Sequence, residues 1–307
     1  MDMVISARGQ AIQALKEMLA MPESSASDEV IAAVVKLAIS DICYAETQDL
    51  QVHADGVHEM TRLRGGLPTL GMHGVLAKIA ILVDWAIALS LESPSSFSDQ
   101  EISGHADHLR HTTPTTGSTS PLELPDPDSR HTSLPPDRLE HTTVAMLKDV
   151  EFLLDAVLAL PQAPSQWQLR KVQSMSEWVH GRLSGATEQT SSTSPLHHAA
   201  RLASLLYCRT IEAREPFSRV IHEGDVAELV DAVWKVPLDV WNNHLDTLLW
   251  VLATVLPTAR NMAQFYTTKT MMMAAAVQLL VADWNAAAAV LSRVVKLQAW
   301  LRTCPQD

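Results

Sequence analysis

Apolar residues recur along most of the chain at the spacing of an amphipathic α-helix. The first such stripe advances in steps of 7, 3 and 4 residues and consists of Ile5, Ile12, Leu15 and Leu19. A capping signal at Ser25-Ala-Ser-Asp28 precedes a second helix over Val30–Tyr44. No run alternates apolar and polar residues for long enough to predict a sheet. The pattern therefore predicts an all-α fold.

Glycine and proline set the expected ends of the other helices. A third helix is predicted over about Asp49–Arg64, where Gly65-Gly66 stops it, and a fourth over about Met72–Leu91. Later helices are expected near 143–160, 165–183, 196–213, 224–235, 238–256, 258–281 and 283–302. The prediction is an irregular multi-helix bundle of about ten helices.

Two stretches lose the apolar periodicity. Residues 103–142 are dense in Ser, Thr, Pro, Asp and His, and residues 184–195 are dense in Ser and Thr. Such segments bury too little apolar surface to offset the entropy lost on ordering, so we expect a disordered or loose loop and a short flexible loop. The helices on either side are expected to form a single domain over residues 1–307.

Composition narrows the class of protein. The formal charge is −12 and no basic face is visible, which disfavours direct DNA binding and binding to acidic lipid. The three cysteines, Cys43, Cys208 and Cys304, form no CxxC pair, so neither a disulfide framework nor a zinc cluster is expected. We expect an intracellular protein, in the nucleus or the cytoplasm.

No membrane span is expected either. The N-terminus lacks the basic and apolar regions of a signal peptide. The apolar run over Gly74–Leu91 carries Lys78 and Asp84 near its middle, so it is interpreted as a core helix.

Motifs for cofactors and metals are weak. His105, His108 and His111 form an H-x₂-H-x₂-H run, but no carboxylate or cysteine completes a rigid site, and we interpret the run as a polar linker. Gly65-Gly66 follows a helix rather than a strand, which favours a helix end over a phosphate loop. The sequence therefore predicts no metal and no cofactor.

Four polar residues are candidates for acid, base or orienting roles. Asp84 and Asp283 each lie in an apolar helical context, where a carboxylate needs a donor partner or its pKa rises. His53 and His58 are five positions apart on one helix and point about 140° apart, so one is expected toward the core and the other toward solvent. A structural role for all four is the simpler interpretation.

Tryptophan and methionine gather in the C-terminal third. Helix-spaced residues of these types commonly form the core, but they also line apolar cavities that accept flexible ligands. The candidates for lining such a pocket are Trp85, Trp234, Trp241, Trp250, Met262 and Met272.

Several segments, in the same order along the chain, resemble one family. They are His53-Ala-Asp-Gly-Val-His-Glu-Met60, Leu63-Arg-Gly-Gly-Leu67, Leu70-Gly71, Asp84-Trp-Ala86, Ala199–Tyr207, Thr247–Leu252 and Asp283–Trp300. The sequence resembles the fungal-specific transcription factor domain, the helical regulatory region that follows binuclear zinc clusters. The resemblance spans about residues 30–302 and implies a helical scaffold, a fungal source and a role in sensing a ligand or a partner.

The chain departs from that family because the zinc cluster, its basic linker and its coiled coil are missing from the sequence. The first hypothesis is a stand-alone regulatory module in fungal secondary metabolism that senses an apolar small molecule or a protein partner, with a homodimer left open. The second is a cofactor-free cyclase, isomerase or pericyclase that acts on an apolar metabolite. The third is a truncated gene product without activity.

Overall fold

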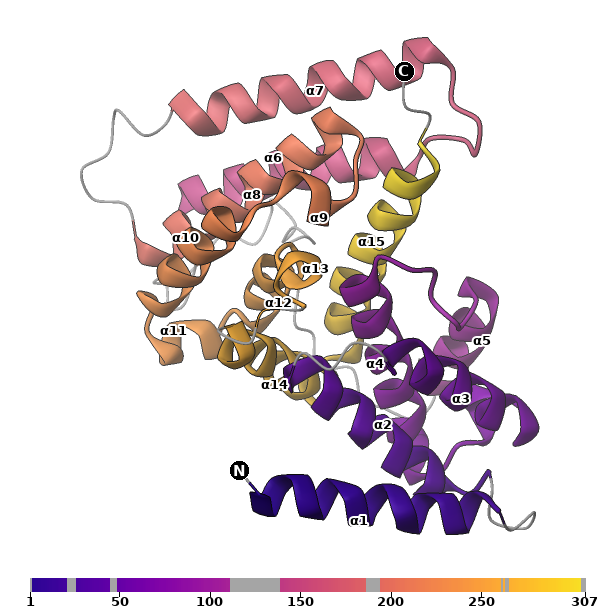
Figure 1. Cartoon of the computed structure of the whole chain (residues 1–307). Coiled ribbons are helices and arrows are strands. Elements are labelled where there is room, and N and C mark those ends of the chain that lie inside the picture. Colours follow the sequence, from indigo (N-terminus) through magenta and orange to yellow (C-terminus); the bar gives the residue numbers. More distant parts are fainter. Residues whose placement is uncertain are drawn as a thin grey trace, which may run out of the picture. The chain divides into compact units, whose positions relative to one another are not determined.

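The computed structural model describes residues 2–20, 26–44, 49–110, 139–185, 194–260, 262 and 265–304. Within these residues the chain forms fifteen α-helices and two short 3₁₀-helices and no strand (Figure 1). The all-α prediction is confirmed. The helix count exceeds the predicted ten because Asp99–Arg110 and Phe217–Val220 were not predicted as helices, and because the helix predicted over 238–256 is divided.

The described residues group into two compact units. The first joins residues 1–88 with 95–115. Its helices are α1 (Asp2–Leu19), α2 (Asp28–Tyr44), α3 (Leu50–Leu63), η1 (Leu67–Thr69), η2 (Met72–Gly74), most of α4 (Val75–Leu91) and α5 (Asp99–Arg110). In this unit α2 packs along α3, α1 lies against α2, and α5 contacts η1. The prediction of one domain over residues 1–307 stays a prediction.

A tight turn joins α3 to the segment before α4. Gly65 and Gly66 have φ angles of 101° and 100°, which glycine adopts far more readily than other residues. Asp28, at the start of α2, holds this turn: it pairs with Arg64 at 3.1 Å and accepts a hydrogen bond from the Gly71 backbone N–H at 3.1 Å. The interpretation of Gly65-Gly66 as a helix end is confirmed.

The α4 region is apolar enough to cross a membrane by length and composition. The stretch Met72–Leu91 has a mean hydropathy of 1.9, and 83% of it is buried inside the protein. Within the described part of the chain no second helix passes the same test. Burial of this kind is typical of a core helix, because a spanning helix would present its apolar surface to lipid.

The second unit holds residues 89–94 and the chain from 116 onward. Its helices are α6 (His141–Leu158), α7 (Gln166–Gly185), α8 (Pro195–Ala213), α9 (Phe217–Val220), α10 (Glu223–Trp234), α11 (Leu238–Asn242), α12 (Leu245–Ala253), α13 (Leu256–Ala259), α14 (Tyr266–Ala282) and α15 (Trp284–Thr303). The α7 helix packs against both α6 and α8, and α12 packs against α14 and α15 (Figure 1).

The core of the second unit centres on α8 and α12. Tyr207 is fully buried, stacks on Trp250 at a ring distance of 4.7 Å and donates its hydroxyl to the Trp250 carbonyl. Phe217 meets the same tyrosine edge-on. Since aromatic side chains bury large apolar areas, this cluster ties α8, α9 and α12 together.

Two sequence-based boundaries differ from the structure. We expected a loose loop from residue 103, but residues 103–110 belong to α5, whose start is capped by reciprocal hydrogen bonds between Ser98 and Glu101. The helix predicted over 238–256 is divided into α11, α12 and α13, and α14 begins at Tyr266 rather than at 258. Residues 141–142 of the first predicted loop belong to α6, and residues 184–185 and 195 of the second belong to α7 and α8. Residues 111–138 and 186–193 lie outside the described residues.

Candidate functional site

Asp84 is held by the segment that follows α4. Its carboxylate accepts hydrogen bonds from the Ser95 hydroxyl, from the Ser96 backbone N–H at 2.9 Å and from the Phe97 backbone N–H at 3.4 Å. Burial raises the pKa of Asp84, and these three donors act in the opposite direction. The carboxylate therefore fixes residues 95–97 against α4.

The two candidate histidines pair with carboxylates inside the first unit. His53 Nε2 lies 3.0 Å from Asp41 Oδ2 and links α3 to α2. His58 Nε2 lies 3.4 Å from Glu101 Oε1, and its ring meets the Phe97 ring edge-on at 5.2 Å. Both histidine side chains are partly exposed, so the expected division into one core and one solvent residue is not observed. The structure does bring His58 and Asp84 to the same neighbour, Phe97.

Asp283 caps the last helix of the second unit. Its side chain accepts a hydrogen bond from the Ala286 backbone N–H at 3.1 Å, which satisfies one of the free donors at the start of α15. A second carboxyl, Asp246, lies close enough to feel its charge. Burial, with a smaller contribution from the negative charge of Asp283, raises the pKa of Asp246 to about 6.

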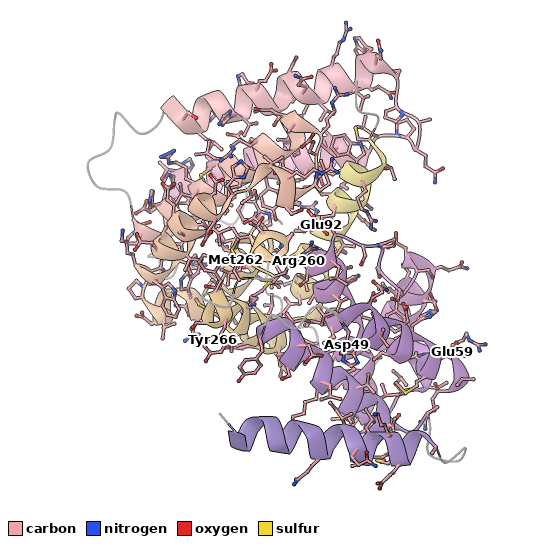
Figure 2. The ribbon with its side chains drawn as sticks, viewed as in Figure 1. Asp49, Glu59, Glu92, Arg260, Met262 and Tyr266 are labelled. Carbon is pink, nitrogen blue, oxygen red and sulfur yellow. The ribbon has the colours of Figure 1, made fainter. Side chains whose placement is uncertain are left out.

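The predicted aromatic and methionine residues lie mainly in the core. Trp85, Trp241, Trp250 and Met272 are each at most 3% exposed. Trp241 donates its indole N–H to the Val233 carbonyl at 3.1 Å. Trp234 is 52% exposed, and Met262, labelled in Figure 2, is partly exposed at the end of the α13 region. None of these residues lines the cavity described next. Their role in lining a ligand pocket stays a prediction.

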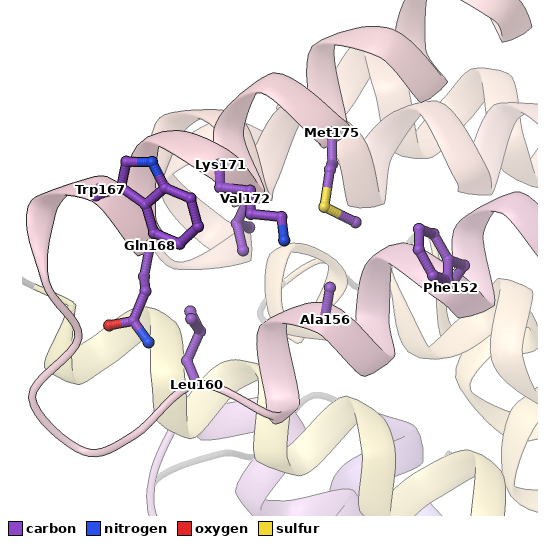
Figure 3. Close-up of a pocket in the computed structure, with 8 residues that line it drawn as sticks. All are labelled: Phe152, Ala156, Leu160, Trp167, Gln168, Lys171, Val172 and Met175. Atoms are coloured by element: carbon purple, nitrogen blue, oxygen red, sulfur yellow. The ribbon is translucent and has the colours of Figure 1, made fainter.

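A cavity of about 270 Å³ lies between α6 and α7 (Figure 3). Eight residues line it: Phe152 and Ala156 of α6, Leu160 after that helix, and Trp167, Gln168, Lys171, Val172 and Met175 of α7. Six of these side chains are apolar, and Lys171 is the charged one. The cavity is therefore suited to apolar groups, with one cation at its edge.

Large aromatic side chains are exposed on the two helices that line this cavity. Phe152, Trp167 and Trp178 are 67%, 69% and 57% exposed. The Lys171 ammonium lies 5.5 Å from the Trp167 ring centre, and the Arg182 guanidinium lies 4.7 Å from that of Trp178. We refer to the cavity and these aromatic residues together as the α6–α7 groove. Clustered exposed apolar residues of this size are typical of an interaction surface.

The apolar pattern of the sequence does not indicate this groove. Its two tryptophans follow the same helical spacing as core tryptophans, so periodicity alone does not distinguish them. A usable signal was present in Trp167-x₃-Lys171 and Trp178-x₃-Arg182. A cation one turn after each tryptophan on the same face marks that face as exposed to solvent.

Comparison with known families gives a match over residues 3–256 to the family described as "Fungal specific transcription factor domain". The chain belongs to this family. No curated protein and no solved structure gave a match. The recognition made from sequence motifs is confirmed, although its last segment, Asp283–Trp300, lies beyond the matched residues.

In this fungal transcription factor domain, the sequence segments that identify the family have structural roles. Leu63-Arg-Gly-Gly-Leu67 forms the turn that Asp28 holds, and Leu67 is buried. Thr247–Leu252 lies in α12 with every residue buried. The family indicates a regulatory role and favours an intracellular location. The α6–α7 groove lies within the matched residues, so it belongs to the regulatory region.

Proposed function

We propose that this chain is a regulatory module of fungal gene expression that acts by binding a protein partner in the α6–α7 groove. The observation that carries the proposal is the exposure of Phe152 and Trp167, which line an apolar cavity, and of Trp178 farther along α7. Tryptophan and other large aromatics dominate the binding energy of protein interfaces when a partner covers them. An exposed set around a hollow is therefore suited to that use.

The size of the cavity favours a protein segment over a small molecule. Ligand pockets commonly enclose about 300 to 1,000 Å³ and bury most of the ligand. The groove cavity, at about 270 Å³, lies just below that range, and its aromatic walls are exposed rather than closed over it. Anchor side chains of a partner fit such a hollow. A free small molecule bound there is the alternative that the experiments below distinguish.

The contacts of the polar candidates favour binding over catalysis. Asp84 and Asp283 already accept backbone N–H groups, and His53 pairs with the buried Asp41. A general acid or base has to be free to reach its substrate. The cofactor-free enzyme stays an untested hypothesis with less support than the binding module.

The location and the targets that we propose follow from the net charge and from the family. A formal charge of −12 supports a module that does not itself contact DNA or an acidic membrane. We propose a nuclear or cytoplasmic location and a target set in secondary metabolism. A homodimer is a further proposal, which sedimentation of the full chain tests.

The first experiment measures transcripts in a fungal host that carries the wild-type gene or one of two variants. The double variant Phe152→Ala, Trp167→Ala removes two exposed groove aromatics, whereas Trp234→Ala removes an exposed tryptophan of similar exposure on α10. Exposed substitutions alter the free energy of unfolding by about 0.5 kcal/mol or less, so both variants are expected to fold. We expect the groove variant alone to shift transcripts of the target pathway at least as far as gene deletion does.

Equal transcripts in the groove variant and the wild type would remove the proposal. So would steady transcripts in a deletion strain in which a single intermediate accumulates, because that result is expected of an enzyme. Thermal melts of both purified variants serve as the control for folding.

A further inference from the structure

The exposed face of α7 carries an ordered series of aromatic and basic side chains. Along the helix the order is Trp167, Lys171, Met175, Trp178 and Arg182. At 100° per residue these five positions fall within about 80° of arc, and the series is about 22 Å long. One face of α7 therefore presents a continuous strip about four helical turns long.

The carboxylates of α6 are already occupied by arginines. Asp149 pairs with Arg182 at 3.0 Å, at the end of the strip farthest from Trp167. Glu151 and Asp155 both pair with Arg293 of α15, at 3.0 and 2.8 Å. The α6 side of the groove therefore presents little uncompensated negative charge.

The cations at the other end of the strip are placed differently. Lys171 holds its ammonium over the Trp167 ring rather than on a carboxylate in the described part of the chain. Arg170 lies one turn after Trp167 and is exposed. The aromatic end of the groove thus has a local positive charge on a protein whose formal charge is −12.

Resting on the proposed function, we propose that the occupant of the α6–α7 groove is an amphipathic helix with acidic residues beside its apolar face. Its apolar anchors enter the cavity between Phe152 and Met175, and its carboxylates meet Lys171 and Arg170. A helix laid in a groove buries residues at positions i, i+3, i+4 and i+7. The length of the strip matches about four turns of such a helix.

Local charge outweighs the net charge in this recognition. At physiological ionic strength the Debye length is about 8 Å, so distant acidic residues are largely screened while Lys171 is within direct reach of a bound carboxylate. An acidic lipid surface is a poorer occupant, because it would bring many further acidic residues of the chain close to like charge.

The test uses the full chain and two labelled synthetic peptides of about five helical turns. Both carry leucine and phenylalanine on one face; one has glutamate and the other lysine at the flanking positions. We expect fluorescence anisotropy to show the acidic peptide binding at least about tenfold more tightly than the basic one. Trp167→Ala should weaken acidic-peptide binding at least about tenfold, as expected for an aromatic anchor.

Charge reversal gives the sharper result. Lys171→Glu should weaken binding of the acidic peptide by about fivefold or more, since it converts an attraction into a repulsion. For the basic peptide it converts a repulsion into an attraction, so binding should become tighter. Lys235→Glu, at an exposed lysine beside the exposed Trp234, is the matched control and should change neither affinity. Added salt should weaken binding of the acidic peptide but not of the basic one.

Equal affinity for both peptides, or no change in Lys171→Glu, overturns the inference. A dimer of the chain that Trp167→Ala dissociates in sedimentation also overturns it, because the occupant is then a second copy. These outcomes leave the proposed function standing if the groove variant still alters transcripts in the host. Unchanged transcripts in that variant remove the proposed function itself.

Discussion

At the scale of single residues, Asp246 shows how burial and a neighbouring charge act together. It lies at the start of α12, partly buried, and its carboxylate accepts a hydrogen bond from the Thr247 backbone N–H. Burial and the nearby Asp283 nevertheless raise its pKa from 3.8 to about 6. Because the folded-state pKa is raised, the charged form destabilises the fold, and stability is lost as the pH rises from about 4 to about 6.

Replacing this carboxyl by an amide should stabilise the protein at neutral pH. Asp246→Asn keeps an oxygen for the Thr247 N–H and removes the charge, so the free energy of unfolding at pH 7 should rise by about 1 to 3 kcal/mol. Urea denaturation at pH 4, 5, 6 and 7 measures this, with the gain disappearing toward pH 4. Asp239→Asn, at an exposed position, is the control and should show no gain. An equal gain in the free energy of unfolding at pH 4 and pH 7 would contradict the raised pKa of Asp246.

Single residues also show what could and could not be predicted from the sequence. Asp84 and Asp283 stood out because a carboxylate in an apolar helix needs donors, and donors are what the structure supplies. The identity of these donors depends on where residues 95–97 lie and on where α15 begins. No local sequence pattern predicts either of these. Trp234 and Trp241 look alike in sequence, yet one is exposed and the other is buried.

At the scale of elements, helix existence was predictable and helix division was not. The periodicity located α2, α3, α4, α7 and α8 to within a few residues. The break between α11 and α12 falls at Asn243-His244, where polar residues interrupt an apolar run without a proline. The start of α5 carried a capping box, Ser98-Asp-Gln-Glu101, inside a polar stretch that composition had marked as a loop. At the start of α5, local hydrogen bonds outweighed composition.

The segment between α3 and α4, which Asp28 holds, leads to a separate prediction at this scale. A Cβ added at Gly71 would lie 2.1 Å from Asp28 Oδ2, so Gly71→Ala forces Asp28 out of its contacts with this segment. We expect a loss of about 1 to 3 kcal/mol in the free energy of unfolding. Gly56→Ala inside α3 meets nothing within 4 Å and should instead stabilise the helix by up to about 1 kcal/mol.

Urea denaturation of both alanine variants distinguishes the two glycines. Opposite signs are expected for Gly71→Ala and Gly56→Ala. A Gly71→Ala protein as stable as the wild type would show that Asp28 does not hold this segment. Because both substitutions add the same methyl group, the comparison isolates the effect of the contact.

At the scale of the whole molecule, the family gives the scaffold and the surface gives the proposed role. The match over residues 3–256 covers helices of both compact units, and the α6–α7 groove lies inside it. A net negative protein with one local basic and aromatic strip is suited to a partner that carries apolar and acidic groups together. Periodicity predicted the bundle, but the groove depends on which helix faces are left uncovered after packing.

Photo-cross-linking in the fungal host tests the central claim most directly. A benzophenone amino acid in place of Phe152 lies at the groove, and the same amino acid in place of Trp234 serves as the control on α10. We expect one protein adduct from the Phe152 position that is absent from the Trp234 position, joined through an acidic, apolar segment of the partner. A small-molecule adduct alone, the same adducts from both positions, or no protein adduct at Phe152 would contradict the account.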